Sequence, residues 1–287
     1  MLKSFSFFSV LLCLIFFSLL PGCGRQSAEK GKRTVTTTIA PLAYLMKGVA
    51  GDRMEVQTFI PRGASPETYE PAPSALSALH HSLAYVEVGC LGFEQSWSRR
   101  LSEEYPHLVF CSLDTGLQLA GSADHPDPHI WLSPRNMEVM ADQVYHLLCH
   151  IDQVNTEYYR ENHLLLQERI SLVEDSVRTL LAPCGRIPFM VFHPTLTYFA
   201  RDYGLNQIVI EEEGKEPSAR RLKALVEEAR RSGVKVVLVQ KEFDTRSAQM
   251  VAEAVGAAVE VIDPLSEDWD REMIRIASVL RKYAAHS

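Results

Sequence analysis

Residues 155–181 read NTEYYRENHLLLQERISLVEDSVRTLL, and this stretch decides how the chain is organised. Apolar side chains recur in it at spacings of three or four residues or their multiples: Tyr159, Leu166, Ile170, Val173, Val177 and Leu181. The pattern predicts one amphipathic helix about 40 Å long, which Pro183 and Gly185 close. A helix hairpin broken near Asn162 and His163 is the alternative. A single helix of this length can run along two lobes.

Short apolar runs that predict strands lie on both sides of this helix. They are Thr34–Ile39, Met54–Ile60, Ala84–Val88 and His107–Cys111 before it, and Phe189–Phe192, Gln207–Ile210, Val234–Val239 and Val259–Ile262 after it. Val234–Val239 is rich in β-branched residues and nearly continuous, as expected of a parallel strand that helices cover on both faces. Helical patterns such as Ser218–Ser232 and Thr245–Val255 separate the strands.

Strands that alternate with helices predict an α/β fold. We expect two lobes, each a mostly parallel sheet flanked by helices, joined by one long rigid helix. The N-terminal lobe is predicted over residues 34–154, the linking helix over 155–182 and the C-terminal lobe over 183–287. A helix from Pro134 to about Ile151 is assigned to the first lobe.

The first residues form an apolar segment, from Phe5 to Leu20, with the positive charge of Lys3 ahead of it. About 16 apolar residues suit the hydrophobic region of a signal peptide and are short for a membrane span of about 20 residues. The segment ends in Leu-Pro-Gly-Cys at positions 20–23, which looks like a bacterial lipobox.

A lipobox predicts cleavage after a signal peptide at 1–22 and lipidation of Cys23. Residues 23–33 are polar and would tether the lipid to the folded part. The chain is then an exported, membrane-anchored lipoprotein that faces the periplasm or the cell exterior. The alternatives are an ordinary signal peptide cut elsewhere and an uncleaved anchor.

The composition describes a globular protein, because 46% of the 287 residues are hydrophobic and 23% are charged. The net charge is −7 and no block of lysine and arginine occurs, so no nucleic-acid partner is predicted.

Six cysteines occur, of which Cys13 and Cys23 belong to the signal and the lipid site. The others are Cys90, Cys111, Cys149 and Cys184, with no Cys-x-x-Cys motif. An exported protein can pair cysteines, but we favour buried thiols that act as small apolar side chains, without a metal role.

Candidate metal ligands lie where strands end and in proline-rich loops. His193 and Asp263 directly follow predicted strands, and ligands of open α/β sheets bind at the carboxyl ends of strands. Glu67 and His129 lie in proline-rich loops. Imidazole and carboxylate together suit zinc, manganese or iron. Each residue alone also has an ordinary explanation as a strand-end histidine, a turn or a solvated charge.

Several blocks in a fixed order link these residues. They are Ile39-Ala40-Pro41-Leu42, the Gly63–Pro73 loop, Asp127-Pro128-His129-Ile130-Trp131-Leu132-Ser133-Pro134, Phe192-His193-Pro194 leading to Tyr198–Leu205, and Ile262-Asp263-Pro264-Leu265. Over about residues 33–283, the chain resembles the cluster A-I, or cluster 9, metal-binding lipoproteins. These are the solute-binding proteins of zinc and manganese ABC transporters.

The resemblance implies that a metal binds between the two lobes at Glu67, His129, His193 and Asp263. The first ligand of the family is usually histidine, so Glu67 departs from the pattern. Two imidazoles and two carboxylates move the preference toward manganese or iron without excluding zinc, and the general strength of zinc on nitrogen and oxygen sites keeps it first over manganese. His125 and Glu70 are possible accessory ligands.

The function that the resemblance implies is capture of a divalent ion and its delivery to an ABC transporter permease, without catalysis. The linking helix implies a modest conformational change, and we expect a monomer. A manganese- or iron-binding member of the same family is the nearest alternative. A zinc-dependent hydrolase and a metal-binding adhesin are the others, although no His-Glu-x-x-His motif occurs.

Overall fold

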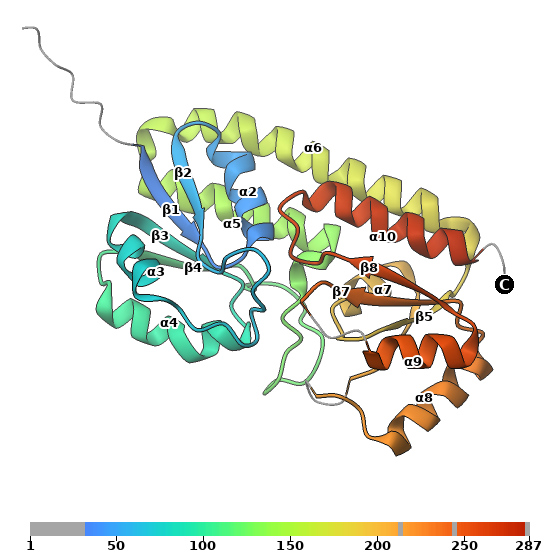
Figure 1. Cartoon of the computed structure of the whole chain (residues 1–287). Coiled ribbons are helices and arrows are strands. Elements are labelled where there is room, and N and C mark those ends of the chain that lie inside the picture. Colours follow the sequence, from blue (N-terminus) through green and yellow to red (C-terminus); the bar gives the residue numbers. More distant parts are fainter. Residues whose placement is uncertain (1–31, 212–214, 243–245, 285–287) are drawn as a thin grey trace, which may run out of the picture. The chain divides into compact units, whose positions relative to one another are not determined.

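A computed structural model describes residues 32–211, 215–242 and 246–284 (Figure 1). The predicted signal peptide, the lipid site at Cys23 and nearly all of the tether lie outside the described residues. No helix within the described part of the chain has the length and apolar character that crossing a membrane requires.

The first sheet has four parallel strands in the order β2-β1-β3-β4. Its strands and connecting helices are β1 (Arg33–Thr37), α2 (Ala40–Ala50), β2 (Met54–Thr58), α3 (Pro73–Ala78), β3 (Ser82–Glu87), α4 (Gly92–Glu104) and β4 (Val109–Ser112). Neighbouring strands along the chain are joined through helices, as parallel pairing requires. All strands predicted for this lobe are present, with ends that differ by at most two residues from the prediction.

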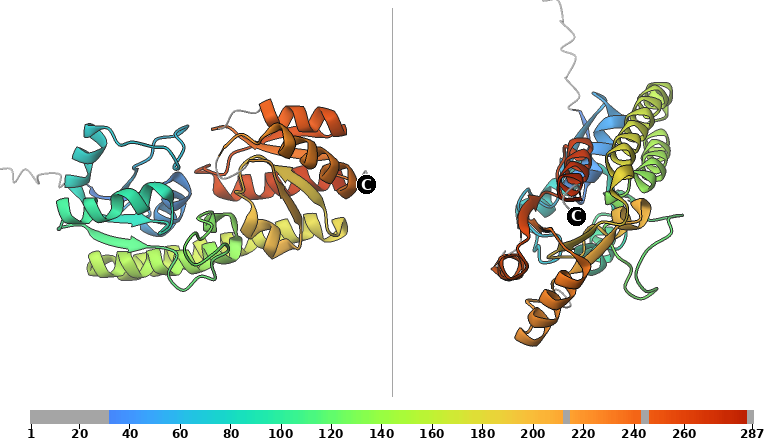
Figure 2. Two further views of the ribbon diagram at one scale, coloured as in Figure 1. Left: turned by 90° about the horizontal axis from the view of Figure 1, so that it is seen from below. Right: turned by 90° about the vertical axis from the view of Figure 1, so that its right-hand side faces the viewer.

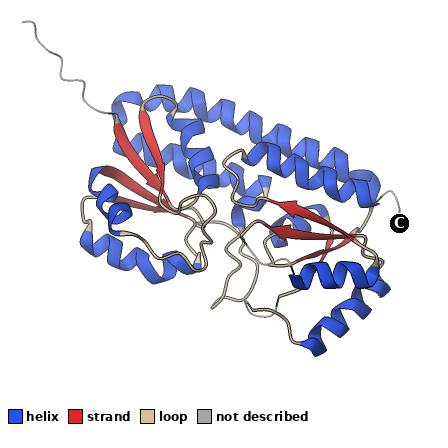
Figure 3. Ribbon diagram, in the orientation of Figure 1, coloured by secondary structure: helices blue, strands red, loops and turns tan. Residues whose placement is uncertain are grey.

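The second sheet repeats this plan in the order β6-β5-β7-β8, again all parallel. Its elements are β5 (Pro188–Val191), α7 (Thr197–Tyr203), β6 (Asn206–Val209), α8 (Ala219–Ser232), β7 (Val236–Gln240), α9 (Arg246–Val255) and β8 (Ala258–Ile262). Every residue of β7 is buried, which confirms the strand predicted within 234–239. Helices lie on both sides of each sheet (Figure 3), so the predicted α/β fold is confirmed.

The two sheets share a strand order that changes direction once, between β1 and β3 in the first and between β5 and β7 in the second. In open α/β sheets, this switch point opens a crevice at the carboxyl ends of the strands. The topology therefore assigns a ligand position to the loops that follow these strands.

One unbroken helix, α6 (Thr156–Leu181), separates the two sheets along the chain, so the helix-hairpin alternative is wrong. Its buried side chains are the six predicted from the periodicity: Tyr159, Leu166, Ile170, Val173, Val177 and Leu181. It packs against α2 and α5 (Pro134–Ile151) of the first lobe and against α10 (Trp269–Ala284) of the second (Figure 2). The helix therefore belongs to the packing of both lobes.

A single hydrophobic core passes from the first sheet through α6 into the second, and includes Val35, Ile170 and Leu238. A smaller cluster lies between the second sheet and helices α8 and α9. None of the four described cysteines is in a disulfide. Cys90 is buried, as predicted, whereas the other three thiols are half-buried.

Candidate metal site

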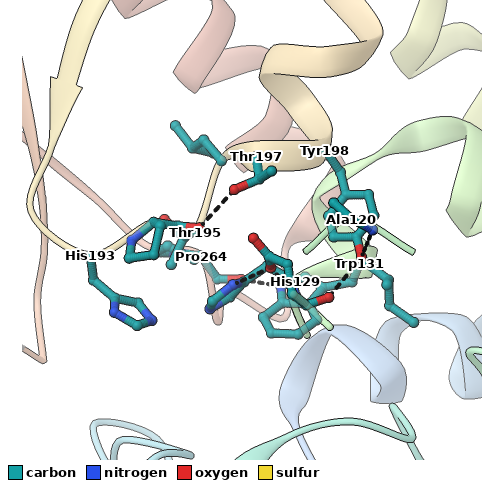
Figure 4. A network of polar contacts seen from close by, with 12 residues as sticks. Ala120, His129, Trp131, His193, Thr195, Thr197, Tyr198 and Pro264 are labelled. Atoms are coloured by element: carbon teal, nitrogen blue, oxygen red, sulfur yellow. Dashed lines mark hydrogen bonds and ion pairs between the residues drawn. The ribbon is translucent and has the colours of Figure 1, made fainter. Parts of the chain in front are cut away.

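Three side chains converge in the described part of the chain in a way that could hold a metal ion. Glu67, His129 and His193 each offer one ligand atom, and these atoms lie within 4.8 Å of one another. The rings of His129 and His193 have their centroids 5.1 Å apart and their planes 75° apart (Figure 4). One carboxylate and two imidazoles therefore face a common point.

The three residues come from loops at the carboxyl ends of the strands. Glu67 lies in the loop between β2 and α3, and His193 lies two residues beyond the end of β5. His129 lies just before a short 3₁₀ turn and α5. The first turn of α5 is fixed by Pro134 and by a hydrogen bond from the Asn136 backbone N–H to the Ser133 hydroxyl. The site therefore forms only when the two lobes are assembled.

Asp127 sets the orientation of His129. Its Oδ1 accepts from the His129 backbone N–H at 2.9 Å and lies 2.8 Å from the ring Nδ1. A proton on Nδ1 leaves the lone pair of Nε2 for a metal, the arrangement that carboxylates impose on ligand histidines. Burial alone would raise the pKa of Asp127, but the bonds from His129 outweigh it, and the pKa is lowered. Asp127 is therefore held as an anion.

Helix α7 fixes the position of Asp127 from the second lobe. The Tyr198 hydroxyl donates to the Asp127 carbonyl at 2.7 Å and accepts from the Ala120 backbone N–H at 3.0 Å (Figure 4). The loop that carries His129 is thus tied to the lobe that carries His193.

His193 has a carboxylate neighbour of its own, because Glu211 Oε1 lies 2.9 Å from its Nδ1. The Glu211 side chain is only 6% exposed and follows β6, the strand next to β5. Gln240, at the end of β7, donates through Nε2 to the His193 carbonyl and to the Thr195 hydroxyl, both at 2.8 Å. These contacts hold His193 from two neighbouring strands.

The wall behind Glu67 is formed by the start of α4. A Cβ placed on Gly92 would lie 3.1 Å from Glu67 Oε2, so glycine permits the close approach of this carboxylate. The buried Glu94 carboxylate fixes the preceding loop by accepting from the backbone N–H groups of Val88, Gly89 and Leu91. Burial, helped by nearby Glu87, raises the pKa of Glu94 to about 7.

The space that the three side chains enclose is small. The cavity has a volume of about 30 Å³ and its apolar walls include Leu91, Trp131 and Leu265. A single water needs roughly 10–15 Å³ by this measure, so the cavity suits an ion with one small co-ligand. Sugars and amino acids are too large for it.

Comparison with known proteins agrees with this geometry. The family described as zinc-uptake complex component A, periplasmic (ZnuA) matches residues 35–282. The chain belongs to the ZnuA family. A crystal structure of ZnuA is 34% identical, with a TM-score of 0.84 over 88% of this chain and 98% of that one.

This ZnuA-family chain is also similar to a second zinc-uptake protein in sequence and to a manganese-bound protein in fold. The high-affinity zinc uptake system protein ZnuA of Bacillus subtilis is 27% identical over 87% of this chain and 85% of its own. The solute-binding protein FpvC of Pseudomonas aeruginosa, solved in complex with Mn²⁺, is 20% identical. FpvC shares the fold, with a TM-score of 0.78 over 89% of this chain and all of its own.

The fourth predicted ligand in this ZnuA-family chain, Asp263, lies outside the cluster of Glu67, His129 and His193. Its Oδ2 accepts from Lys241 Nζ at 2.7 Å instead. Asp263 lines a neighbouring cavity of about 330 Å³, whereas Glu242 lines both cavities. The ligand role of Asp263 stays a prediction, and in the structure its carboxylate is engaged by a cation.

The two accessory candidates are also outside the cluster. Glu70 is exposed, and so is His125, which lies in a turn that a bridge between Gly121 and Pro126 closes. Their accessory role stays untested.

Sequence reasoning missed Asp127, Glu211 and Gln240, which position the two histidines. Asp127 could have been found, because ligand histidines commonly pair with a carboxylate and Asp127 lies two residues before His129. Glu211 and Gln240 end strands at the same sheet edge as His193, so the edge rule that identified His193 applies to them as well.

Substituting Asp127 by asparagine is expected to weaken zinc binding about tenfold, the lower end of the range for losing such a partner. The amide can still accept from Nδ1, but it lacks the negative charge that raises the basicity of the ring. Competition against a fluorescent chelator measures the change. Asp124→Asn, an exposed aspartate in the same loop, is the control and should leave affinity unchanged.

Proposed function

We propose that this chain captures a divalent transition metal, zinc in the first place, and delivers it to the permease of an ABC transporter. The observation that carries the proposal is the convergence of Glu67, His129 and His193 within 4.8 Å. Asp127 and Glu211 lie behind the two histidines as carboxylate partners. Such backing is typical of histidines that hold a metal.

The donor set supports zinc over manganese. Zinc accepts two imidazoles and a carboxylate with a fourth ligand in tetrahedral geometry, whereas manganese favours more ligands and oxygen-rich, octahedral sites. The cluster offers two nitrogens and one oxygen in a small cavity. The B. subtilis relative is named a zinc uptake protein, which supports the same metal.

The lipid anchor predicted at Cys23 fits this function. A tethered binding protein stays at high local concentration beside a membrane partner instead of diffusing away. We propose that the chain acts on the outer side of the membrane, as the family's periplasmic description supports.

The cavity argues against the hydrolase alternative. A catalytic zinc also uses three protein ligands and an open position, so ligand number alone does not separate the two functions. Pockets that admit organic substrates usually measure about 300–1,000 Å³. The space around the three ligands measures about 30 Å³, which is well below this range and suits an ion.

Elemental analysis of the purified protein, followed by competitive titration of zinc against manganese, tests the proposal. We expect one equivalent of zinc and a preference for zinc over manganese. A protein that binds neither metal in stoichiometric amount would contradict it. Repeating the titration on Glu67→Ala tests whether this carboxylate coordinates, and unchanged affinity would remove Glu67 from the ligand set.

Zinc affinity is expected to fall as the pH is lowered, because protons compete with the metal for the ring nitrogens of His129 and His193. Titrations at pH 7.5, 6.5 and 5.5 in one non-coordinating buffer measure the trend. Affinity that is constant across this range would show that the histidines do not bind the metal.

A further inference from the structure

Lys241 and Asp263 leave two neighbouring strands at the same level of the second sheet. Gln240 and Ile262 are register partners in β7 and β8, so the residues that follow them emerge side by side. Lys241 Nζ donates to Asp263 Oδ2 at 2.7 Å. The lysine side chain is 59% exposed and that of the aspartate 26%, so the ammonium can turn into solvent while the carboxylate stays at the cavity wall.

The backbone around Asp263 is held independently of this ion pair. The Asp263 N–H donates to the buried Glu272 carboxylate at 2.7 Å, and the Asp263 carbonyl accepts from the Ser266 N–H at 3.0 Å. The carbonyl of the next residue, Pro264, accepts from Trp131 Nε1 at 2.8 Å. A change in what Asp263 contacts is therefore confined to its side chain.

The position of Asp263 is close to the three-ligand cluster without being part of it. The cavity that Asp263 lines shares Glu242 and Leu265 with the cavity of Glu67, His129 and His193. The cluster offers three ligand atoms, one fewer than four-coordinate zinc takes. Asp263 is therefore a candidate for the fourth position, and its carboxylate is now paired with Lys241.

We propose that Lys241 competes with the metal ion for the Asp263 carboxylate and thereby lowers metal affinity and speeds metal release. This inference rests on the proposed function. Without metal, the ammonium holds Asp263 in the larger cavity. When a dication occupies the cluster, it repels the ammonium and attracts the carboxylate, so Lys241 turns outward and Asp263 rotates toward the ion.

The size of the effect follows from the exposure of the pair. An ion pair this accessible to water contributes little free energy, which corresponds to about a two- to fivefold change in an equilibrium constant. A competitor of this strength lowers affinity without abolishing binding. That suits a protein that must also give up its metal.

The test compares zinc affinity and zinc dissociation rate in variants of the whole mature protein. Lys241→Met is expected to bind zinc about two- to fivefold more tightly and to release it more slowly. Lys241→Arg keeps the cation and should behave like the unmodified protein. Arg62→Met is the matched control, because Arg62 lines the same cavity but pairs with Glu267 at 2.8 Å. It should change affinity by less than about twofold.

The double variant Lys241→Met/Asp263→Asn separates competition from simple charge repulsion. If Lys241 acts through Asp263, Lys241→Met has no further effect once Asp263 is asparagine. An equal gain in both backgrounds, or no gain in the single variant, would overturn the inference while leaving zinc capture intact. If the unmodified protein binds no zinc, it is the proposed function that fails.

Discussion

Replacing His193 with alanine is expected to weaken zinc binding by more than about a hundredfold, because loss of even an outer partner of a ligand weakens binding about 10- to 100-fold. The variant removes one of the three side chains that meet in the cluster. The cluster then keeps Glu67 and His129, and even with Asp263 as a further ligand a four-coordinate ion lacks one protein ligand. Titration against a chelator of known affinity measures the loss.

The fold should survive this change. The backbone of His193 stays bonded to Gln240 through its carbonyl, and the half-buried ring contributes little to the core. Circular dichroism of the metal-free variant checks this point. His81→Ala is the matched control, since His81 is an exposed histidine outside the cluster. Equal losses in the two variants would mean that zinc binds elsewhere.

The second large effect is expected on stability. Trp131→Ala should lower the free energy of unfolding by about 3–5 kcal/mol, the usual loss for a buried tryptophan. Trp131 is 1% exposed and donates from Nε1 to the Pro264 carbonyl. Its own carbonyl accepts from Trp269 Nε1 at 2.7 Å. The substitution opens a cavity where the segment after His129 meets the segment after Asp263.

Urea unfolding of metal-free protein measures this loss. Trp97→Ala is the control, because Trp97 is half-buried on α4, where Arg100 stacks on its ring. It should lose clearly less stability than Trp131→Ala. A loss for Trp131→Ala below about 1 kcal/mol would show that its pocket collapses without strain or that the contact with Pro264 is weak.

Features that depend on local pattern could be read from the sequence. The spacing of Tyr159, Leu166 and Ile170 defined the buried face of α6, and the β-branched run around Val237 defined a central strand. These predictions succeed because buried positions recur every three to four residues in a helix and are continuous in a covered strand, and apolar side chains fill them. Strand ends shifted by one or two residues, since no side-chain signal marks where pairing stops.

The site was less accessible to such reasoning. Strand ends and proline-rich loops identified the residues that cluster, but which carboxylate turns toward the metal depends on neighbours far apart in the chain. Asp263 is held by Lys241, and no spacing rule predicts that ion pair. The partners of the two histidines, Asp127 and Glu211, likewise follow from the assembled lobes.

The single core that passes through α6 makes the two lobes one cooperative folding unit. Ile170 and Val177, on the same helix, belong to the same cluster as Val35 of the first sheet and Leu238 of the second. Neither half expressed alone would cover its share of α6, so we expect that fragments split at this helix do not fold independently. Heat should therefore unfold both halves together, and a metal ion bound by the loops between them would stabilise the entire chain.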